Sequence, residues 1–250
     1  FQYLMPFEWH KPDSRYRVAV FGSSGGIGSA LVEDLASRPG VASVLAYSRA
    51  GGGSTLAKIE AHSVDVTADA ALEQAAAAVD EPLDIVIVAT GTLHSDRYGP
   101  ERRISEVNAE SMLEVYRINT VAPALIARHF LPLLTPDRRS VFAALSARVG
   151  SIADNRLGGW TSYRASKAAL NMVLRTFAIE HGRRRKNSII AGLHPGTVDT
   201  GLSKPFSGNV PEGKLFSPSQ SAKYLVDVID GLEPDDSGGL FAWDGQRIDY

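Results

Sequence analysis

Two side chains capable of acid–base chemistry lie four residues apart near the middle of the chain. Tyr163 and Lys167 begin a run in which apolar residues recur at helical spacing, and residues i and i+4 share one face of a helix. The phenol and the ammonium are therefore expected side by side. A free tyrosine has a pKa near ~10 and is a poor acid or base at neutral pH. Because a neighbouring cation favours the phenolate, we predict that Lys167 lowers the pKa of Tyr163 and prepares it for general acid–base catalysis.

A serine upstream of this pair is a candidate to bind the reacting oxygen of a substrate. Ser146 follows the apolar run Ser140–Leu145, which predicts a buried strand, and open α/β sheets bind their ligands at the carboxyl ends of the strands. The spacing of Tyr163 and Lys167 alone is common by chance, and an exposed helical pair is the alternative interpretation. A serine at the end of a strand makes the combination more specific.

A glycine-rich stretch near the start of the chain predicts a nucleotide site. The apolar run Arg17–Phe21 reads as a strand, and it is followed at once by Gly22, Ser23, Ser24, Gly25, Gly26, Ile27 and Gly28. Such a turn between a strand and a helix lets the backbone approach a pyrophosphate and directs the helix N-terminus at it. The spacing is G-x-x-x-G-x-G rather than the commoner G-x-G-x-x-G, and a turn of this kind is a weak signal when it stands alone.

An arginine after the second predicted strand bears on which nucleotide binds. Residues 41–47 form an apolar run that ends at Ser48 and Arg49, without an Asp or Glu. In dinucleotide folds an acidic residue here binds the ribose 2′-hydroxyl, whereas an arginine accommodates a 2′-phosphate. Charge complementarity therefore favours NADPH over NADH. A solvated loop arginine is the alternative interpretation.

A proline lies within a long predicted helix at 110–134. Pro123 has no N–H, so it cannot bond the carbonyl of Asn119 four residues earlier, and that carbonyl is free for another donor. A kinked helix with no further role is the alternative interpretation.

The composition fits one globular domain and excludes several classes of protein. The chain has 250 residues, of which 44% are hydrophobic and 22% are charged. A net charge of −2 argues against a nucleic-acid partner, and the absence of cysteine excludes disulfides and thiol catalysis. The six histidines lack metal-ligand spacing, so no metal site is expected. No apolar run reaches the ~20 residues of a membrane span, and no cleavable leader pattern is present, so we expect a cytoplasmic protein without a membrane partner.

In chain order, these motifs resemble those of the short-chain dehydrogenase/reductase family. The matching positions are GSSGGIG at Gly22–Gly28, Asp65-Val66, Ala89-Thr90-Gly91, Asn119, Ser146, Tyr163 with Lys167, and Pro195-Gly196. The passages SYRASKAALN from Ser162 and HPGTVDTGLSKPF from His194 are similar to the C-factor-like carbonyl reductase branch. The resemblance covers the chain from Arg17 to Tyr250.

The resemblance implies an enzyme that transfers hydride between a nicotinamide and a small carbonyl or alcohol substrate. Ser146 then binds the substrate oxygen, Tyr163 transfers the proton and Lys167 also holds the nicotinamide ribose. A water on the backbone carbonyl of Asn119 extends the proton relay. An NADP(H)-binding signalling or sensor protein of the C-factor type, with incidental turnover, is the alternative function.

Further cofactor contacts are implied by the same resemblance, in addition to the glycine-rich stretch. Asp65 contacts the adenine amino group, and Val66 packs on the ring. The backbone of Val198 binds the nicotinamide carboxamide, and Thr200 contacts the carboxamide or a phosphate. The other implied contacts are Ala89, Thr90, Gly91, Tyr163, Lys167 and Pro195. Ala89-Thr90-Gly91 departs from the Asn-Ala-Gly of many relatives, which predicts weaker stability rather than lost binding.

The alternation of strands and helices predicts a single-domain Rossmann fold. The predicted strands are 17–21, 41–47, 62–66, 84–88, 140–145, 188–193 and 239–243, and the helices after the first are 68–79, 110–134, 159–182 and 217–228. This order predicts a doubly wound parallel sheet of seven strands flanked by helices. Helices 110–134 and 159–182 are implied by the resemblance to pair into a homodimer or homotetramer.

Two segments are expected to differ from the rest of the domain, which spans residues 17–250. Because the chain does not begin with methionine and its start lacks periodicity, residues 1–16 are expected to be an N-terminal extension, in part a cloning remnant. Residues 201–216 mix glycine, proline and apolar residues, and we expect them to form a substrate loop with an apolar underside.

Overall fold

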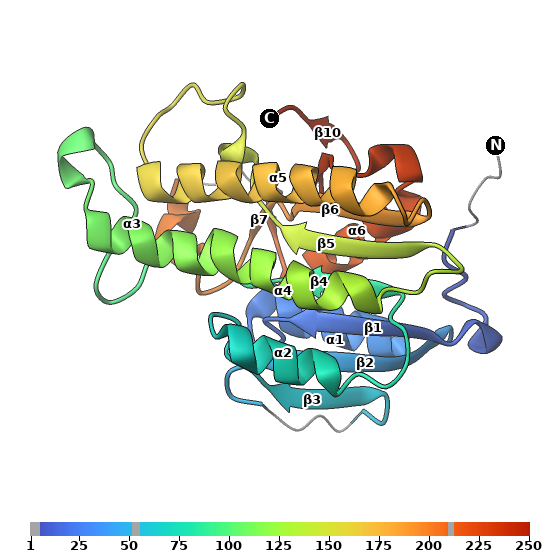
Figure 1. Ribbon diagram of the computed structural model, residues 1–250. Helices are drawn as coiled ribbons and strands as arrows, with labels where there is room; N and C mark the ends of the chain where they lie inside the picture. The colour runs from blue at the N-terminus through green and yellow to red at the C-terminus, as the bar shows by residue number, and fades with distance from the viewer. Residues whose placement is uncertain (1–5, 52–55, 210–212) are drawn as a thin grey trace.

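The computed structural model describes residues 6–51, 56–209 and 213–250, except for the side chains of 206, 207 and 209. Within them, a sheet of eight strands in the order β10-β9-β6-β5-β4-β1-β2-β3 lies between two layers of helices (Figure 1). The strands are β1 (Tyr16–Phe21), β2 (Val41–Ser48), β3 (Ile59–Ser63), β4 (Ile85–Val88), β5 (Ser140–Leu145), β6 (Ser188–His194), β9 (Leu240–Ala242) and β10 (Arg247–Ile248). All pairs are parallel except β9 with β10. A second sheet consists of β7 (Thr197–Val198) and β8 (Leu215–Phe216).

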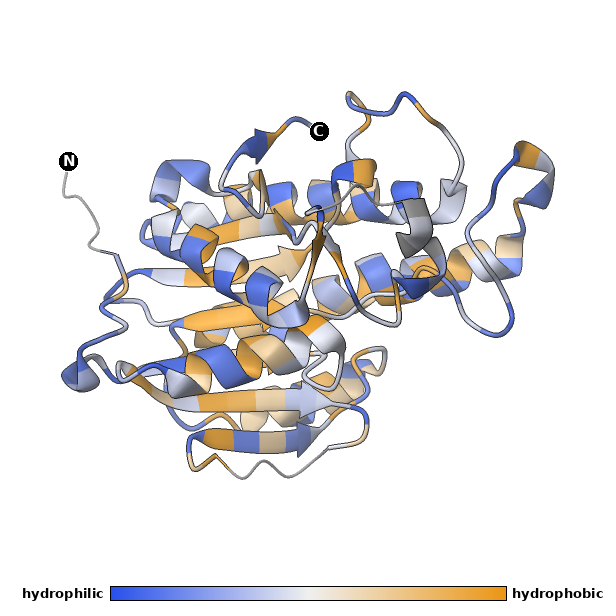
Figure 2. Cartoon of the chain, turned by 180° about the vertical axis from the view of Figure 1, so that it is seen from behind, coloured by the Kyte–Doolittle hydropathy of each residue, from blue (hydrophilic) through white to orange (hydrophobic). Residues whose placement is uncertain are grey.

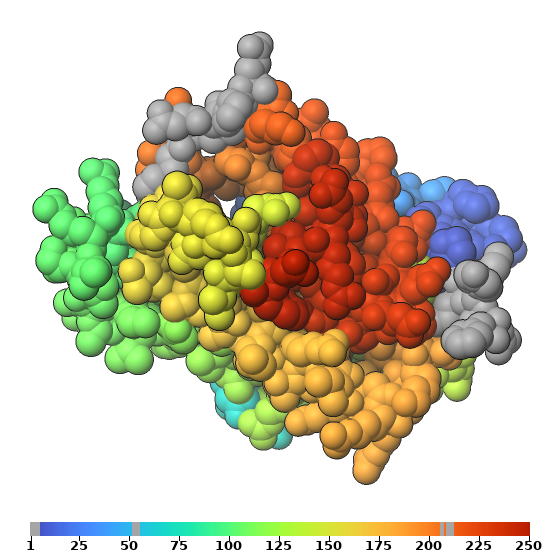
Figure 3. Space-filling model, turned by 90° about the horizontal axis from the view of Figure 1, so that it is seen from above, coloured from blue at the N-terminus to red at the C-terminus, as the bar shows by residue number. Residues whose placement is uncertain are grey.

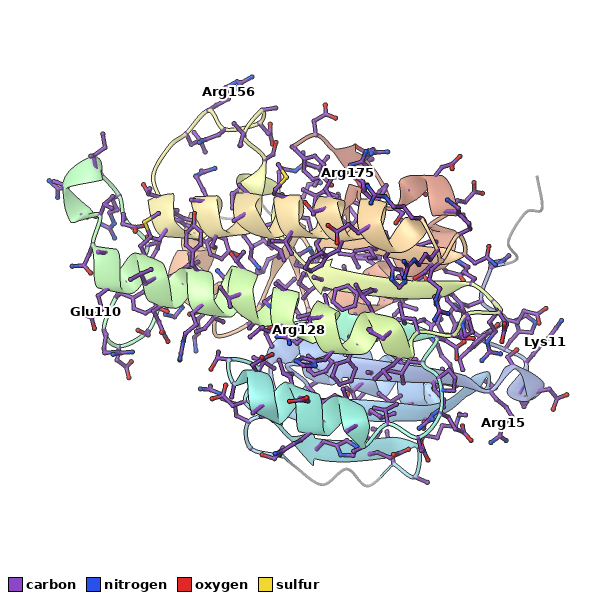
Figure 4. The ribbon with its side chains drawn as sticks, in the orientation of Figure 1. Lys11, Arg15, Glu110, Arg128, Arg156 and Arg175 are labelled. Carbon is purple, nitrogen blue, oxygen red and sulfur yellow. The ribbon has the colours of Figure 1, made fainter. Side chains whose placement is uncertain are left out.

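Helices cover both faces of the central sheet. The face seen in Figure 2 carries α1 (Gly26–Ser37) and α6 (Pro218–Gly231). The face seen in Figure 1 carries α2 (Asp69–Ala77), α4 (Ala122–Phe130) and α5 (Thr161–Gly182), and α3 (Ala109–Tyr116) projects beyond the sheet. Arg128 reaches from α4 to α2, where it pairs with Asp69 at 3.0 Å (Figure 4).

Strand β1 shows why both faces must be covered. Val18 and Val20 belong to the core on the α1 and α6 side, whereas Phe21 packs edge-on against Phe130 of α4. Successive strand residues point to opposite faces, so a strand that is apolar throughout needs a helical layer on each side. Figure 2 shows these strands as mainly hydrophobic between helices whose outer faces are hydrophilic.

The sheet confirms the predicted fold class, and two details of its strands differ from the prediction. The sheet has an eighth strand, β10, because the chain reverses at Gly245, whose φ of +80° suits glycine. The third strand lies at 59–63 rather than 62–66. This strand forms the edge of the sheet and its side chains are partly or fully exposed, so it lacks the apolar run of a buried strand. Pairing of Ile59 with Val44 sets its register.

The helix predicted at 110–134 is interrupted in the middle. A π-helical turn, Arg117–Val121, separates α3 from α4, and the N–H of Ala122 donates to the carbonyl of Arg117 five residues earlier. Pro123 follows directly and cannot continue the regular ladder. The irregularity predicted at Asn119 and Pro123 is therefore confirmed, and Asn119 is fully buried there.

Part of the N-terminal extension packs on the domain. β1 already begins at Tyr16, and Phe7 is buried against the rings of Trp9 and Tyr16. The guanidinium of Arg139 lies 4.5 Å from the centre of the Phe7 ring. A short irregular segment has no periodicity that would reveal such packing, and the domain boundary at residue 17 stays a prediction. Residues 1–5 lie outside the described residues.

The expected substrate loop, residues 201–216, includes 210–212, which lie outside the described residues. Lys204–Asn209 forms a 3₁₀ turn. Phe216, at the end of this segment, is buried in an aromatic cluster with Tyr224 and Trp243, at ring-centre distances of 5.3 and 4.7 Å. The side chain of Phe206 lies outside the described residues.

In the part of the chain that the structure describes, no helix is both long and apolar enough to cross a bilayer. The cytoplasmic location stays a prediction.

Candidate active site

A groove runs along the carboxyl ends of the parallel strands. Two adjoining cavities of about 480 and 290 Å³ form it, and they share Gly25, Ala89, Thr90 and Gly91. Of the predicted site residues, the larger cavity is lined by Gly22, Ser24, Arg49, Asp65, Val66, Ala89, Thr90 and Gly91. The smaller is lined by Gly26, Ile27, Gly28, Ala89, Thr90, Gly91, Ser146, Tyr163, Lys167, Pro195 and Thr200. Ser23, Asn119 and Val198 line neither cavity.

The glycine-rich turn forms a backbone cradle at the centre of the groove. Gly22 has a φ of +82°, and a Cβ atom there would lie 3.0 Å from the backbone of Ala89 and Thr90. At Gly28 a Cβ would lie 2.1 Å from the carbonyl oxygen of Gly22. Side chains are therefore excluded where the turn, β4 and α1 meet. Ser23 stays outside the groove, and its N–H donates to the carbonyl of Tyr47.

Three arginines and two carboxylates, Asp65 and Glu114, line the far end of the groove, and Arg117 pairs with Glu114 at 3.3 Å. Arg49 lies there as predicted, together with Arg97 and Arg117, which the sequence analysis missed because they come from a loop and a helix distant in the chain. Hydrogen bonds from the backbone and side chain of Thr67 lower the pKa of Asp65, and the charges of Arg117 and Arg49 lower it further. This end of the groove suits an anionic group.

Tyr163 and Lys167 meet at the opposite end of the groove, with electrostatics that differ from the prediction. The Nζ of Lys167 lies 5.8 Å from the centre of the Tyr163 ring and donates to the carbonyl of Leu145 at 2.7 Å. Burial raises the pKa of Tyr163 to about 12 and lowers the pKa of Lys167 to about 8. The prediction that Lys167 lowers the pKa of Tyr163 is therefore wrong for the protein alone, because desolvation of the buried phenol raises that pKa.

Ser146 lies at the end of β5 as predicted and has a partner that the sequence analysis missed. Its Oγ donates to the Oδ1 of Asn171 at 2.7 Å, and both side chains are buried. Asn171 lies one turn beyond Lys167 on α5, so helical spacing from Tyr163 through Lys167 could have identified it.

Asn119 connects three elements around the site through its side chain. Its Oδ1 accepts from the N–H of Thr92 at 2.8 Å, and its Nδ2 donates to the carbonyl of Thr92 and to Ser166 of α5. The chain after β4 is thereby held to α5. The role expected for the Asn119 carbonyl in a proton relay stays a prediction.

Two loops extend the walls of the site beyond the strands. Segments 92–108 and 148–160 meet where the N–H of Trp160 donates to the carbonyl of Glu101, and they lie side by side in Figure 3 (green and yellow). The buried carboxylate of Glu101 accepts from the N–H of Ser162 in the first turn of α5. A carboxylate at a helix N-terminus is stabilising, so this contact fixes the turn that carries Tyr163. Arg156, at the tip of the second loop, points away from the domain (Figure 4).

The segment after β6 supplies the remaining wall. Pro195 and Thr200 line the smaller cavity with Leu202, whereas Val198 is buried in β7 beside Phe216 of β8. The Nε2 of His94 lies 3.2 Å from the carbonyl oxygens of Gly201 and of Leu202, which joins the loop after β4 to the start of the loop after β7. Across residues 6–51, 56–209 and 213–250, no group of three His, Asp or Glu side chains could hold a metal ion.

Comparison with known proteins decides the family. The family model for short chain dehydrogenases matches residues 17–210. The chain belongs to this family. This short-chain dehydrogenase is 34% identical over 190 residues to 1-hydroxy-2-glutathionyl-2-methyl-3-butene dehydrogenase of Rhodococcus sp. (strain AD45), which covers 75% of this chain and 78% of the relative. It is 32% identical over 147 residues to C-signal of Myxococcus xanthus, covering 59% and 83%.

A solved structure gives the same result for the fold. The NADPH-bound carbonyl reductase from chicken fatty liver matches 94% of this short-chain dehydrogenase and 100% of its own chain, with a TM-score of 0.80 and 27% identity. The predicted resemblance is confirmed, and the chain is an oxidoreductase of the short-chain dehydrogenase/reductase family.

Proposed function

We propose that this short-chain dehydrogenase is an NADPH-dependent oxidoreductase that acts on a carbonyl or alcohol through Ser146, Tyr163, Lys167 and Asn119. The observation that carries the proposal is the groove itself. Its two cavities share a glycine-lined centre, and they join an arginine-rich end to the end that holds Ser146 and Tyr163. A dinucleotide needs this combination of a phosphate site and a distant reactive end.

The residues of the groove fit NADPH. The cradle at Gly22–Gly28 leaves room for a pyrophosphate, and the Oγ1 of Thr90, buried and without a hydrogen-bond partner among the described residues, is available to a bound polar group. Arg49 supplies charge for a 2′-phosphate, and Arg97 adds to it, whereas the charge of Arg117 is shared with Glu114 in an ion pair of 3.3 Å. The bound NADPH of the chicken carbonyl reductase supports this preference.

The other cofactor contacts follow the family pattern. Asp65 and Val66 would hold the adenine, and Ala89 and Gly91 would line the nucleotide path. The residues that would hold the nicotinamide and its ribose are Tyr163, Lys167, Pro195, Val198 and Thr200. NADPH supplies the hydride when it is bound.

Tyr163 is the proton donor in the direction of carbonyl reduction. Because burial raises its pKa to about 12, the phenol is protonated at neutral pH and can donate to an oxygen that gains negative charge. Ser146 donates a second hydrogen bond to that oxygen. The pKa of Lys167, about 8, lies near neutral pH, so its Nζ can release and regain a proton. A water held by the carbonyl of Asn119 would pass a proton from solvent to Lys167, which would return it to Tyr163.

The long helices provide a surface for a second copy of the chain. Val121, Met172 and Ile179 are about half exposed or more, with exposed fractions of 47%, 67% and 49%. They extend from the π-helical turn before α4 along α5. Pairing of these helices into a homodimer or homotetramer would bury them, and light scattering of the purified protein tests it.

Oxidation of NADPH and NADH with a panel of aldehydes, ketones, diketones and quinones tests the proposal. We expect turnover, with kcat/KM at least ~10-fold higher for NADPH because one charge-assisted contact to the 2′-phosphate is lost with NADH. The alternative, a signalling or sensor protein of the C-factor type, is supported by the likeness to C-signal. It predicts tight NADPH binding without turnover on any carbonyl, and that result would overturn the enzymatic proposal.

A further inference from the structure

The hydrogen bond between Ser146 and Asn171 has a direction that matters for catalysis. A hydroxyl has one proton to donate and two lone pairs that accept. In the structure Ser146 donates that proton to the Oδ1 of Asn171 at 2.7 Å. A carbonyl oxygen of a substrate is itself an acceptor, so it needs the same proton. While Asn171 accepts it, Ser146 can offer the substrate only lone pairs.

The other end of the Asn171 amide resolves this conflict. Among the described residues, its Nδ2 is buried and has no hydrogen-bond partner. The oxygen and nitrogen of an amide have nearly the same size, so a half-turn of the amide exchanges their positions. Nδ2 then donates to the Oγ of Ser146, and the serine proton is released toward the groove. The exchange gives the buried donor a partner and the substrate oxygen a hydrogen bond, and it moves Oδ1 to the position where Nδ2 had no partner.

The amide of Asn171 is buried next to the site residues of α5. The residue is 3% exposed and lies on the α5 face that also carries Tyr163 and Lys167. Strand β6 packs next to the amide, because a Cβ atom at Gly192 would lie at ordinary contact distance, 3.6 Å, from the Oδ1 of Asn171. Ser146 is equally buried, with 3% exposed.

We propose that Asn171 is a positioning residue that donates to Ser146 and turns the serine proton toward the substrate oxygen. The inference rests on the proposed function, because it assigns Ser146 to that oxygen. Asn171 touches no substrate in this scheme and acts only through Ser146. Its effect on the rate must therefore depend on the serine hydroxyl, and a double-mutant cycle measures that dependence.

The experiment compares the natural protein with Asn171→Leu, Ser146→Ala and the double variant. The hydride-transfer rate is measured in single-turnover stopped flow with NADPH and the best carbonyl of the panel. Leucine keeps the shape of asparagine and removes both its donor and its acceptor. We expect Asn171→Leu to slow hydride transfer at least ~10-fold while the Kd for NADPH stays within ~2-fold, and to slow it less than ~2-fold further in the Ser146→Ala background. The isotope effect with deuterated NADPH should rise in steady state, because hydride transfer becomes more rate-limiting.

Two results would overturn the inference. Asn171→Leu could leave the rate unchanged, or it could slow Ser146→Ala by the same factor as the natural protein, which would mean that it acts through Lys167 or packing. If the leucine variant unfolds, Asn171→Asp replaces it in the cycle, because an ionised carboxylate only accepts and holds the serine proton away from the substrate. Failure of the proposed function gives a different result: the natural protein itself shows no hydride transfer.

Discussion

Replacing Lys167 by methionine tests the electrostatics of the site apart from its chemistry. Burial lowers the pKa of Lys167 from 10.5 to about 8, and the residue is 3% exposed. Between these pH values the unfolded chain holds a proton on Lys167 that the folded protein has lost. The free energy of unfolding of the natural protein therefore rises with pH through this window. Methionine keeps most of the buried chain and removes the titration.

The magnitude follows from the size of the shift. Integrated from pH 7 to pH 10, the proton difference stabilises the natural protein by about 2 kcal/mol relative to Lys167→Met. Below pH 7 Lys167 is protonated in both the folded and the unfolded chain, so the free energies of unfolding of the natural protein and of Lys167→Met differ by a constant amount. Loss of the hydrogen bond to the Leu145 carbonyl lowers the free energy of unfolding of the variant by roughly 1 kcal/mol at every pH. It therefore shifts the whole stability curve of the variant and leaves its dependence on pH unchanged.

Urea unfolding at pH 7, 8, 9 and 10, followed by tryptophan fluorescence, measures the two curves. Lys223→Met is the matched control, because Lys223 is exposed and its hydrogen bond to Asp227 raises its pKa, which moves its titration to higher pH. The free energy of unfolding of Lys223→Met should differ from that of the natural protein by the same amount from pH 7 to pH 10. If the free energy of unfolding of Lys167→Met also differs from that of the natural protein by a constant amount, the reasoning is refuted, since burial then does not displace the proton from Lys167.

Three further substitutions have expected outcomes. Arg49→Gln should raise the KM for NADPH ~10- to 100-fold and leave that for NADH within ~2-fold, because a charge-assisted contact is lost; equal changes in steady-state kinetics with both cofactors would contradict this. Phe7→Ala should lower the free energy of unfolding by about 3 kcal/mol in urea without changing kcat, since Phe7 packs at the amino end of β1, away from the groove; an unchanged stability would show that the segment is not part of the core. Gly28→Ala should weaken NADPH binding, measured by fluorescence titration, more than ~10-fold, because its Cβ would meet the Gly22 carbonyl at 2.1 Å. Gly231→Ala, with open space around it, is the control and should bind normally.

Local patterns were sufficient to predict most of the sheet and the centre of the site. The run Ser140–Leu145 forms β5 as predicted because a strand buried on both faces is apolar throughout. Tyr163 and Lys167 meet because helical spacing places them together, and Ser146 joins them because parallel strands end at the same edge of the sheet.

What the sequence did not reveal depends on contacts between distant segments. The raised pKa of Tyr163 results from burial by surrounding protein, which spacing along α5 cannot report. Arg97 and Arg117 reach the groove from a loop and a π-helical turn that have no motif of their own. Phe7 enters the core from a segment without periodicity. In each case the fold, rather than the local sequence, determines the environment of the residue.

The most direct test of the proposed mechanism is the single-turnover rate of NADPH oxidation by Tyr163→Phe. If the phenol donates the proton, hydride transfer to a carbonyl should fall at least ~100-fold, while the Kd for NADPH stays within ~2-fold, because only the hydroxyl is removed. A variant that binds NADPH normally and keeps a rate near that of the natural protein would contradict the assignment of Tyr163 as the proton donor.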